Sequence, residues 1–491
     1  MSTSAEQTEQ LQRAEQTVQE SVQQSTHVVV IGGGPGGYEA ALVAAQLGAR
    51  VTLVERKGLG GSAVLTDVVP SKTLIATAEV MTLVDDSVEL GVRFPGGGAA
   101  TDPDGSVTVD LAKVNKRVTA LAQAQSADVA RKLRAEGVTL IDGTARLDGP
   151  TRVVAELSSG ETEVLPADVV LVAVGAHPRV LPTAEPDGER ILTWTQLYDL
   201  TELPSRLIVV GSGVTGAEFA SAYDALGADV VLVSSRDRVL PGEDADAARV
   251  IEDVFTRRGM TVLSRSRAAS VERTSDGVLV TLSDGRTVEG SHCLMAVGSV
   301  PNTDGLGLEE AGVRLSSSGH IKVDRVSRTT ARGVYAAGDC TGVLPLASVA
   351  AMQGRIAMWH ALGDAVTPLD LGTVSANVFT APEIATVGVS ETQIESGEVV
   401  QGQVVKLPLE GNPRAKMQGI HDGFVKLFSR RGTGTVIGGV VVAPRASELI
   451  FPVTIAVENK LTVDDVAHAI TVYPSLSGSI AEAARRLHPR R

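Results

Sequence analysis

The feature that most restricts how this chain can fold is a pattern of strand, glycine turn and helix that occurs twice. In the first copy, the largely β-branched run 27–31 leads into Gly32, Gly34 and Gly37, and an Ala- and Leu-rich segment follows over 38–47. The first glycine permits a tight turn, the second lets the backbone approach a pyrophosphate, and the third lets the helix pack closely on the strand. The free N–H groups of the helix N-terminus can bind that pyrophosphate. The pattern predicts a dinucleotide site.

An acidic residue stands where such a site needs one. The next predicted strand, residues 51–54, is followed by Glu55, eighteen residues after Gly37. A carboxylate at this position can accept hydrogen bonds from an adenosine ribose. Glycine turns are common on their own, so the strand before the turn, the helix after it and the acid make the prediction specific.

The second copy of the pattern begins near residue 207. Residues 207–210 and 230–233 are its predicted strands, and the glycines between them are Gly211, Gly213 and Gly216. A chain with two such units can hold two dinucleotides.

The second unit lacks the acid of the first. Eighteen residues after Gly216 stands Ser234, followed by Ser235 and Arg236. A carboxylate here would repel a 2′-phosphate, whereas serines and arginines can bind one. The segment therefore favours NADPH, or the use of both NADPH and NADH, over strict use of NADH. The alternative is a solvated loop that binds no ligand.

Each unit is followed by a similar tail, which indicates an internal duplication. The apolar runs 169–175 and 294–298 end at Gly175 and Gly298, and each has a proline three residues later. From about residue 371, strands and helices alternate without a glycine turn. We predict an α/β protein with two doubly wound, Rossmann-like dinucleotide-binding domains and a C-terminal α+β domain.

Composition excludes several other classes. The 58 acidic residues outnumber the 44 Lys and Arg, and the formal charge of −14 argues against nucleic-acid binding. The longest apolar runs fall short of the ~18 residues of a membrane span. The two cysteines, Cys293 and Cys340, lie 47 positions apart, so we expect neither a zinc or other metal site nor a disulfide framework. Residues 1–25 are predicted to be a disordered tail on a cytoplasmic protein.

Together with Gly338-Asp339 after an apolar strand, these motifs resemble the flavoprotein disulfide reductases, the pyridine nucleotide-disulfide oxidoreductase family that includes lipoamide dehydrogenase and glutathione reductase. The resemblance covers nearly the whole chain after the tail and implies a homodimer. It implies an FAD-binding domain over 26–165 and 295–366, an NAD(P)-binding domain over 166–294 and a dimerisation domain over 367–491.

The resemblance also assigns the binding residues. Those implied for FAD are Gly32, Gly34, Gly37, Glu55, Lys72, Gly175, Gly338, Asp339 and Ala347, the last at the start of a helix that would point at the flavin. Those implied for NADPH or NADH, the electron donor, are Gly211, Gly213, Gly216, Ser234, Ser235, Arg236 and Gly298.

The redox motif of the family is altered in this chain. Residues 60–72 resemble it, but Ala63 and Val68 stand where the family has two cysteines. Tyr473 and Gly478 replace the histidine and glutamate that handle protons for the dithiol. Neither alanine nor valine has a thiol group that could take part in thiol–disulfide exchange, so disulfide chemistry is excluded.

The flavin and its route to nicotinamide remain. Lys72 and Glu218 match an ion pair that family members place beside flavin N5, where a cation stabilises negative charge. We expect a hydride to pass from NAD(P)H through FAD directly to a quinone-type acceptor, as in the actinobacterial quinone reductase branch of the lipoamide dehydrogenase-like proteins. Tyr473 is either a contact or proton donor near the acceptor, or a packing aromatic at the dimer interface.

Two other functions stay open. Residues 345–356 resemble the soluble pyridine-nucleotide transhydrogenases, which also have a degenerate cysteine motif. A non-catalytic flavin-binding scaffold is a further alternative, although the intact second glycine turn argues against it.

Overall fold

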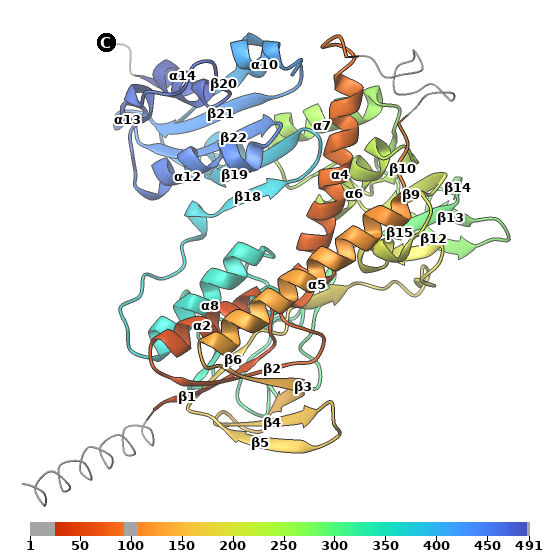
Figure 1. Cartoon of the computed structure of the whole chain (residues 1–491). Helices are drawn as coiled ribbons and strands as arrows, with labels where there is room; N and C mark the ends of the chain where they lie inside the picture. The colour runs from red at the N-terminus through yellow and green to blue at the C-terminus, as the bar shows by residue number, and fades with distance from the viewer. Residues whose placement is uncertain (1–24, 93–106, 489–491) are drawn as a thin grey trace, which may run out of the picture. The chain divides into compact units, whose positions relative to one another are not determined.

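The computed structural model describes residues 25–92 and 107–488, and the chain forms two compact units (Figure 1). The first unit contains the chain up to residue 68 together with 122–177 and 300–369, and the second contains 69–121, 178–299 and 370–491. Apart from Ser25, the expected N-terminal tail lies outside the described residues. None of the described helices is long and apolar enough to cross a bilayer.

The first unit is built on a seven-stranded sheet in the order β17-β6-β1-β2-β3-β4-β5. Its parallel strands are β1 (His27–Ile31), β2 (Arg50–Glu55), β3 (Thr139–Leu147), β6 (Val169–Val172) and β17 (Val334–Ala336). The antiparallel strands β4 (Arg152–Leu157) and β5 (Thr162–Pro166) extend one edge.

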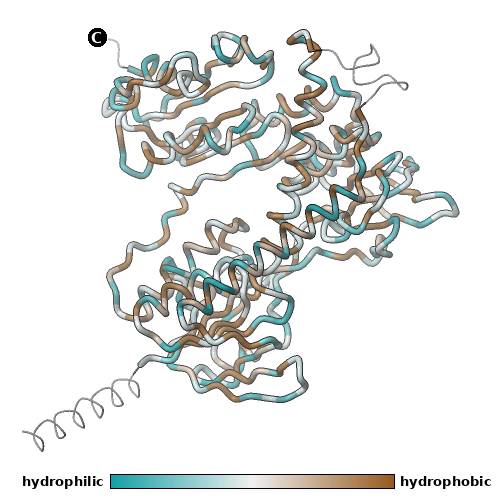
Figure 2. Tube along the Cα trace, viewed as in Figure 1, coloured by the Kyte–Doolittle hydropathy of each residue, from teal (hydrophilic) through white to brown (hydrophobic). Residues whose placement is uncertain are grey.

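Both faces of strand β1 are buried. Val28 and Val30 pack with the helices α2 (Pro35–Gln46) and α8 (Ala347–Ala361), whereas Val29 and Ile31 pack in a separate core on the opposite face. Parallel strands that are covered on both sides need such continuous apolar runs. Figure 2 shows the corresponding hydrophobic colouring of these strands.

The structure differs from the expected domain division at β6. This strand lies between β1 and β17 in the first sheet, although residues 166–294 were expected in the second domain. All four residues of β6 are buried, so the apolar run 169–172 is used to complete the first core.

The second unit repeats the parallel arrangement with the strand order β11-β10-β9-β15-β8. These strands are β8 (Ile191–Thr193), β9 (Arg206–Val210), β10 (Asp229–Val233), β11 (Thr261–Leu263) and β15 (His292–Met295), with helices α6 (Val214–Ala225) and α7 (Ala245–Arg257). An antiparallel meander follows, formed by β12 (Ala268–Arg273), β13 (Val278–Leu282) and β14 (Thr287–Gly290). The meander corresponds to β3, β4 and β5 of the first unit, as the duplication predicts.

The second unit also contains a five-stranded antiparallel sheet in the order β18-β19-β22-β21-β20. Its strands are β18 (Ser375–Val378), β19 (Glu383–Gly388), β20 (Gly402–Pro408), β21 (Phe424–Arg430) and β22 (Val436–Ala443). The helices α12 (Phe451–Glu458) and α14 (Gly478–Leu487) bury their apolar residues against this sheet. The long helices α4 (Val68–Asp86) and α5 (Leu111–Ala135) each contain a boundary between the units.

Candidate active site

The first glycine turn joins β1 to α2, and each of its glycines has the backbone role that the motif predicts. Gly32 has a φ of +101°, and its N–H donates to the Val54 carbonyl at 2.9 Å. A Cβ at Gly37 would lie 1.9 Å from the Gly32 carbonyl oxygen, so the helix can approach the strand only with glycine there. A Cβ at Gly34 would meet nothing closer than 4.0 Å. The turn is therefore closed at Gly37 and open at Gly34, where a phosphate can approach the backbone.

The Glu55 carboxylate is fixed beside this turn by backbone N–H groups. One oxygen accepts from Gly33 at 2.7 Å, and the other accepts from Arg56 at 2.8 Å and Lys57 at 2.7 Å. Carboxylate oxygens have lone pairs left after such bonds, and these can accept ribose hydroxyls. The turn and the acid together suit the ADP part of a dinucleotide.

The end of β17 presents a second polar element of the first unit. Gly338 has a φ of +85°, and its N–H donates to the Gln353 side-chain oxygen at 2.9 Å. Asp339 follows at once, and burial raises the pKa of its carboxyl group. A half-buried carboxyl group of this kind is suited to a hydroxyl donor from a ligand. Ala347 begins α8, whose N-cap residue Leu346 provides no side-chain hydrogen bond.

Gln353 is a residue that sequence reasoning missed. It is 1% exposed, and its amide also donates to Thr341 Oγ1 at 3.4 Å. Its neighbours on the buried face of α8, such as Ala350 and Gly354, are small or apolar. A glutamine at a core position of a helix is the signal that could have revealed it, because buried polar groups need partners.

Gly175 and Gly298 occupy equivalent positions after β6 and β15. Both have left-handed backbones, with φ of +66° and +92°. The Gly175 carbonyl accepts from Asn302 N at 3.0 Å, and the Gly298 carbonyl accepts from Arg179 N at 2.9 Å. This similarity supports the internal duplication.

The second glycine turn reproduces the geometry of the first. Gly211 has a φ of +115°, and its N–H donates to the Val233 carbonyl at 2.9 Å. A Cβ at Gly216 would lie 1.8 Å from the Gly211 carbonyl oxygen, whereas one at Gly213 would meet nothing within 4 Å. The same division into a packing glycine and an open glycine therefore occurs twice.

The three residues expected at the 2′-phosphate differ in exposure. Ser234 is fully buried, and its hydroxyl group lies 2.6 Å from that of Ser212 and accepts from Arg236 N at 3.1 Å. Ser235 and the Arg236 side chain are exposed. In this arrangement Ser234 holds the loop, and Ser235 and Arg236 are the residues open to a ligand.

Lys72 and Glu218 form an ion pair, with 2.8 Å between Nζ and Oε2. The other carboxylate oxygen of Glu218 accepts from Phe379 N at 2.9 Å, and Lys72 Nζ lies 4.7 Å from the centroid of the Phe379 ring. Glu218 is 4% exposed, but the Lys72 side chain is 28% exposed. Both carboxylate oxygens are satisfied, while the cation keeps an open side. The contribution of Phe379 was not predicted, because it comes from a backbone N–H.

Tyr473 lies in an exposed apolar segment with Ile470 and Val472, and its own exposed fraction is 82%. Within the described residues, no hydrogen bond joins Tyr473 to Lys72 or Glu218. The two cysteines are buried, and burial raises the pKa of the Cys340 thiol to about 12. Neither thiol is placed to exchange with a substrate.

Comparison with known proteins identifies the protein family of the chain. The pyridine nucleotide-disulphide oxidoreductase family matches residues 26–354, and the dimerisation domain of that family matches residues 374–484. The chain belongs to the pyridine nucleotide-disulphide oxidoreductase family. The predicted family and fold class are thereby confirmed.

Two named proteins and one crystal structure are similar to the chain over nearly its whole length. The NAD(P)H dehydrogenase (quinone) of Mycobacterium tuberculosis (strain ATCC 25618 / H37Rv) is 56% identical over 471 residues, which is 94% of each chain. The dihydrolipoyl dehydrogenase of Bacillus subtilis (strain 168) is 33% identical over 464 residues, covering 94% of this chain and 96% of the relative. The crystal structure of LpdA from Mycobacterium tuberculosis has a TM-score of 0.89 and 56% identity, with 94% of this chain and 100% of that chain covered.

Proposed function

We propose that the protein is an FAD-dependent NAD(P)H dehydrogenase that reduces a quinone-type acceptor without disulfide chemistry. The observation that carries the proposal is the pairing of Lys72 with Glu218 in a chain where Ala63 and Val68 replace the two redox cysteines. The name of the 56% identical relative supports the same acceptor class.

FAD is the cofactor that the family implies, and the residues of the first unit fit it. The open Gly34, the fixed Glu55 carboxylate and the half-buried Asp339 offer contacts to a pyrophosphate, a ribose and a hydroxylated chain. When bound, FAD supplies the two-electron carrier between the nicotinamide nucleotide and the acceptor.

The nicotinamide nucleotide is assigned to the second glycine turn. Gly213 leaves room for its pyrophosphate, and Ser235 and Arg236 are exposed at the position that follows β10. An arginine can bind a 2′-phosphate through paired N–H donors. We therefore propose that NADPH is accepted, with or without NADH.

Lys72 is proposed to provide a fixed positive charge at the reacting end of the site. Glu218 orients the ammonium group, and Phe379 N–H donates to the other oxygen of the carboxylate. Fixed charges that face developing negative charge need no reorganisation during the reaction.

We also propose a homodimer with FAD-binding, NAD(P)-binding and dimerisation domains, in which β6 belongs to the FAD-binding domain. Phe451, Ile470, Val472 and Tyr473 are exposed apolar residues within the segment that matches the dimerisation domain. A partner subunit would cover such a surface. Tyr473 then lies at the interface, either as a packing residue or beside the acceptor.

Acceptor profiling of the purified yellow protein tests the proposal. With NADPH as donor, we expect reduction of a benzoquinone and none of lipoamide or glutathione disulfide, before and after treatment with iodoacetamide. Appreciable lipoamide turnover would contradict the assignment. Faster reduction of a thio-NAD analogue than of the quinone would indicate a transhydrogenase, and a flavin spectrum that NADPH leaves unchanged would indicate a scaffold.

A further inference from the structure

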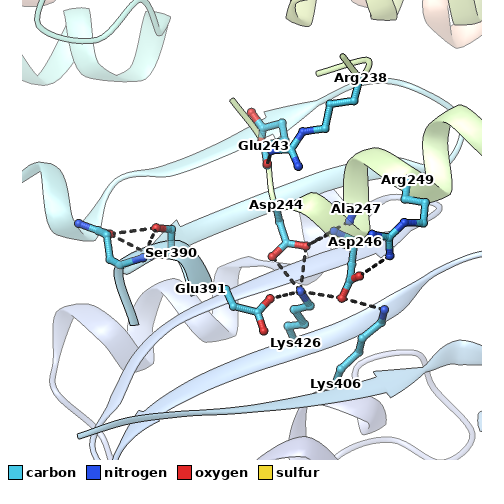
Figure 3. Close-up of polar contacts among 11 residues, drawn as sticks. Arg238, Glu243, Asp244, Asp246, Ala247, Arg249, Ser390, Glu391, Lys406 and Lys426 are labelled. Carbon is cyan, nitrogen blue, oxygen red and sulfur yellow. Dashed lines mark hydrogen bonds and ion pairs between the residues drawn. The ribbon is translucent and has the colours of Figure 1, made fainter. Parts of the chain in front are cut away.

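A buried ammonium group links the five-stranded antiparallel sheet to the second nucleotide-binding domain. The side chain of Lys426 on β21 is 1% exposed, and its Nζ lies 2.9 Å from a carboxylate oxygen of Asp244 and 2.9 Å from one of Asp246. Nζ also forms an ion pair with Glu391, at the start of α9 (Glu391–Glu395) (Figure 3). Three carboxylates from two separate parts of the chain thus share one cation.

The same three carboxylates have the spacing of a metal site, with ligand atoms within 4.8 Å of one another. In this protein Lys426 Nζ already contacts all three. Lys406 adds a second ion pair to Asp246 at 2.9 Å, but its side chain is 40% exposed. Loss of the Lys426 charge would leave carboxylates close together with little compensation, which is strongly unfavourable.

Asp244 connects this cluster to the loop between β10 and α7. It is the N-cap of α7, and its Oδ1 accepts from Asp246 N at 3.0 Å and Ala247 N at 3.1 Å as well as from Lys426. Lys426 therefore fixes the residue at which the loop ends and the helix begins.

The beginning and middle of the loop are fixed by other contacts. The Ser234 hydroxyl group lies 2.6 Å from that of Ser212, and Leu240 N donates to the Ser212 carbonyl at 2.8 Å. Arg238 donates to the carbonyl groups of Pro241 at 3.2 Å and Glu243 at 3.3 Å, which connects the tip of the loop to the residue before Asp244. Between these points Ser235 and Arg236 are exposed.

We infer that Lys426 is a positioning residue for nucleotide selectivity, because it holds the Asp244 end of the loop that presents Ser235 and Arg236. The inference rests on the proposed function, in which this loop binds the 2′-phosphate of NADPH. Lys426 acts through Asp244 and is not itself expected to contact the nucleotide.

The test compares binding of adenosine 2′,5′-bisphosphate and AMP by calorimetry to the FAD-loaded protein. In Lys426→Met, we expect the preference for the bisphosphate to fall by about ten-fold or more, since small displacements of a positioned group are costly. Lys406→Met is the matched control, because it removes an exposed partner of Asp246 without touching Asp244. Its preference should equal that of the wild type.

Asp244→Asn provides a second variant in case Lys426→Met does not fold, because asparagine retains the helix cap while the charge is lost. It should reduce the preference in the same direction. An unchanged preference in Asp244→Asn, or in a folded Lys426→Met, overturns the inference. Arg236→Gln tests the proposed role of the loop separately from the role of Lys426. If this variant also leaves the preference unchanged, the assignment of the loop to the 2′-phosphate is wrong. If it lowers the preference and the other two do not, only the role of Lys426 is wrong.

Discussion

Gly216 and Gly211 approach each other so closely that a methyl group on Gly216 would lie 1.8 Å from the Gly211 carbonyl oxygen. Gly37 and Gly32 repeat the relationship at 1.9 Å. In both turns the third glycine is required by helix packing, and the second faces open space.

This difference predicts separate effects for two alanine substitutions. Gly216→Ala should destabilise the second nucleotide-binding domain by about 3 kcal/mol, because strand and helix must move apart. Gly213→Ala should leave the stability nearly unchanged and weaken NADPH binding, because its methyl group would occupy space needed by the pyrophosphate. Denaturant unfolding and nucleotide titration measure the two effects. Equal losses of stability in both variants would show that the open side of the turn is also a packing surface.

The ion pair of Lys72 and Glu218 allows stability and turnover to be separated. Among the described residues, Lys72→Met leaves the buried Glu218 with only the Phe379 N–H as a partner, so we expect a loss of about 3 kcal/mol in the free energy of unfolding. Lys72→Met/Glu218→Gln should regain most of that stability, because no isolated charge remains.

In both variants, flavin reduction by NADPH should be about 100-fold slower than in the wild type, because neither variant retains the fixed cation. Stopped-flow absorbance gives the rate and denaturant unfolding gives the stability. Recovery of the rate along with the stability in the double variant would mean that the pair is purely structural.

Asp224 predicts a pH-dependent stability. Burial is the main cause that raises the pKa of its carboxyl group to about 6. The positive charge of Arg258 acts to lower this pKa, and the negative charges of Asp229 and Asp85 act to raise it. Below about pH 4 the group is protonated in both the folded and unfolded states and costs nothing. Between about pH 4 and 6 the folded state retains the proton more tightly, so the destabilisation grows as the pH rises and is complete above the folded pKa.

Asp224→Asn should therefore stabilise the protein by about 2 kcal/mol at pH 8, with the advantage shrinking toward pH 4. Thermal unfolding of wild type and variant across this range is the measurement. An advantage that is constant with pH would show that the carboxylate is not the cause.

The sequence predicted the parts of the site that are encoded locally. The glycine turns, Glu55 and the position of Gly338 follow from short spacings after a strand, and such spacings are visible without a structure. The pairing of Lys72 with Glu218 came from a family resemblance, since 146 residues separate them.

Contacts between distant segments could not be predicted from the spacing of residues in the sequence. Asp244, Glu391 and Lys426 share no motif, and only the packing of β21 against the start of α7 and α9 brings them together. Ser234 shows that a motif position alone does not define what a hydroxyl group contacts, because the position predicts a ligand contact whereas the hydroxyl group lies 2.6 Å from that of Ser212 inside the domain. A hydroxyl group serves either role, and the choice depends on burial.

The two-sided burial of β1 has a consequence for reading mutational scans of this enzyme. Since Val28 and Val30 belong to one core and Val29 and Ile31 to another, polar replacements should be rejected at consecutive positions instead of at every second one. An unbroken block of intolerance would then run directly into Gly32. Substitutions in β1 and at Gly37 would report on packing, whereas those at the open Gly34 would report on nucleotide recognition.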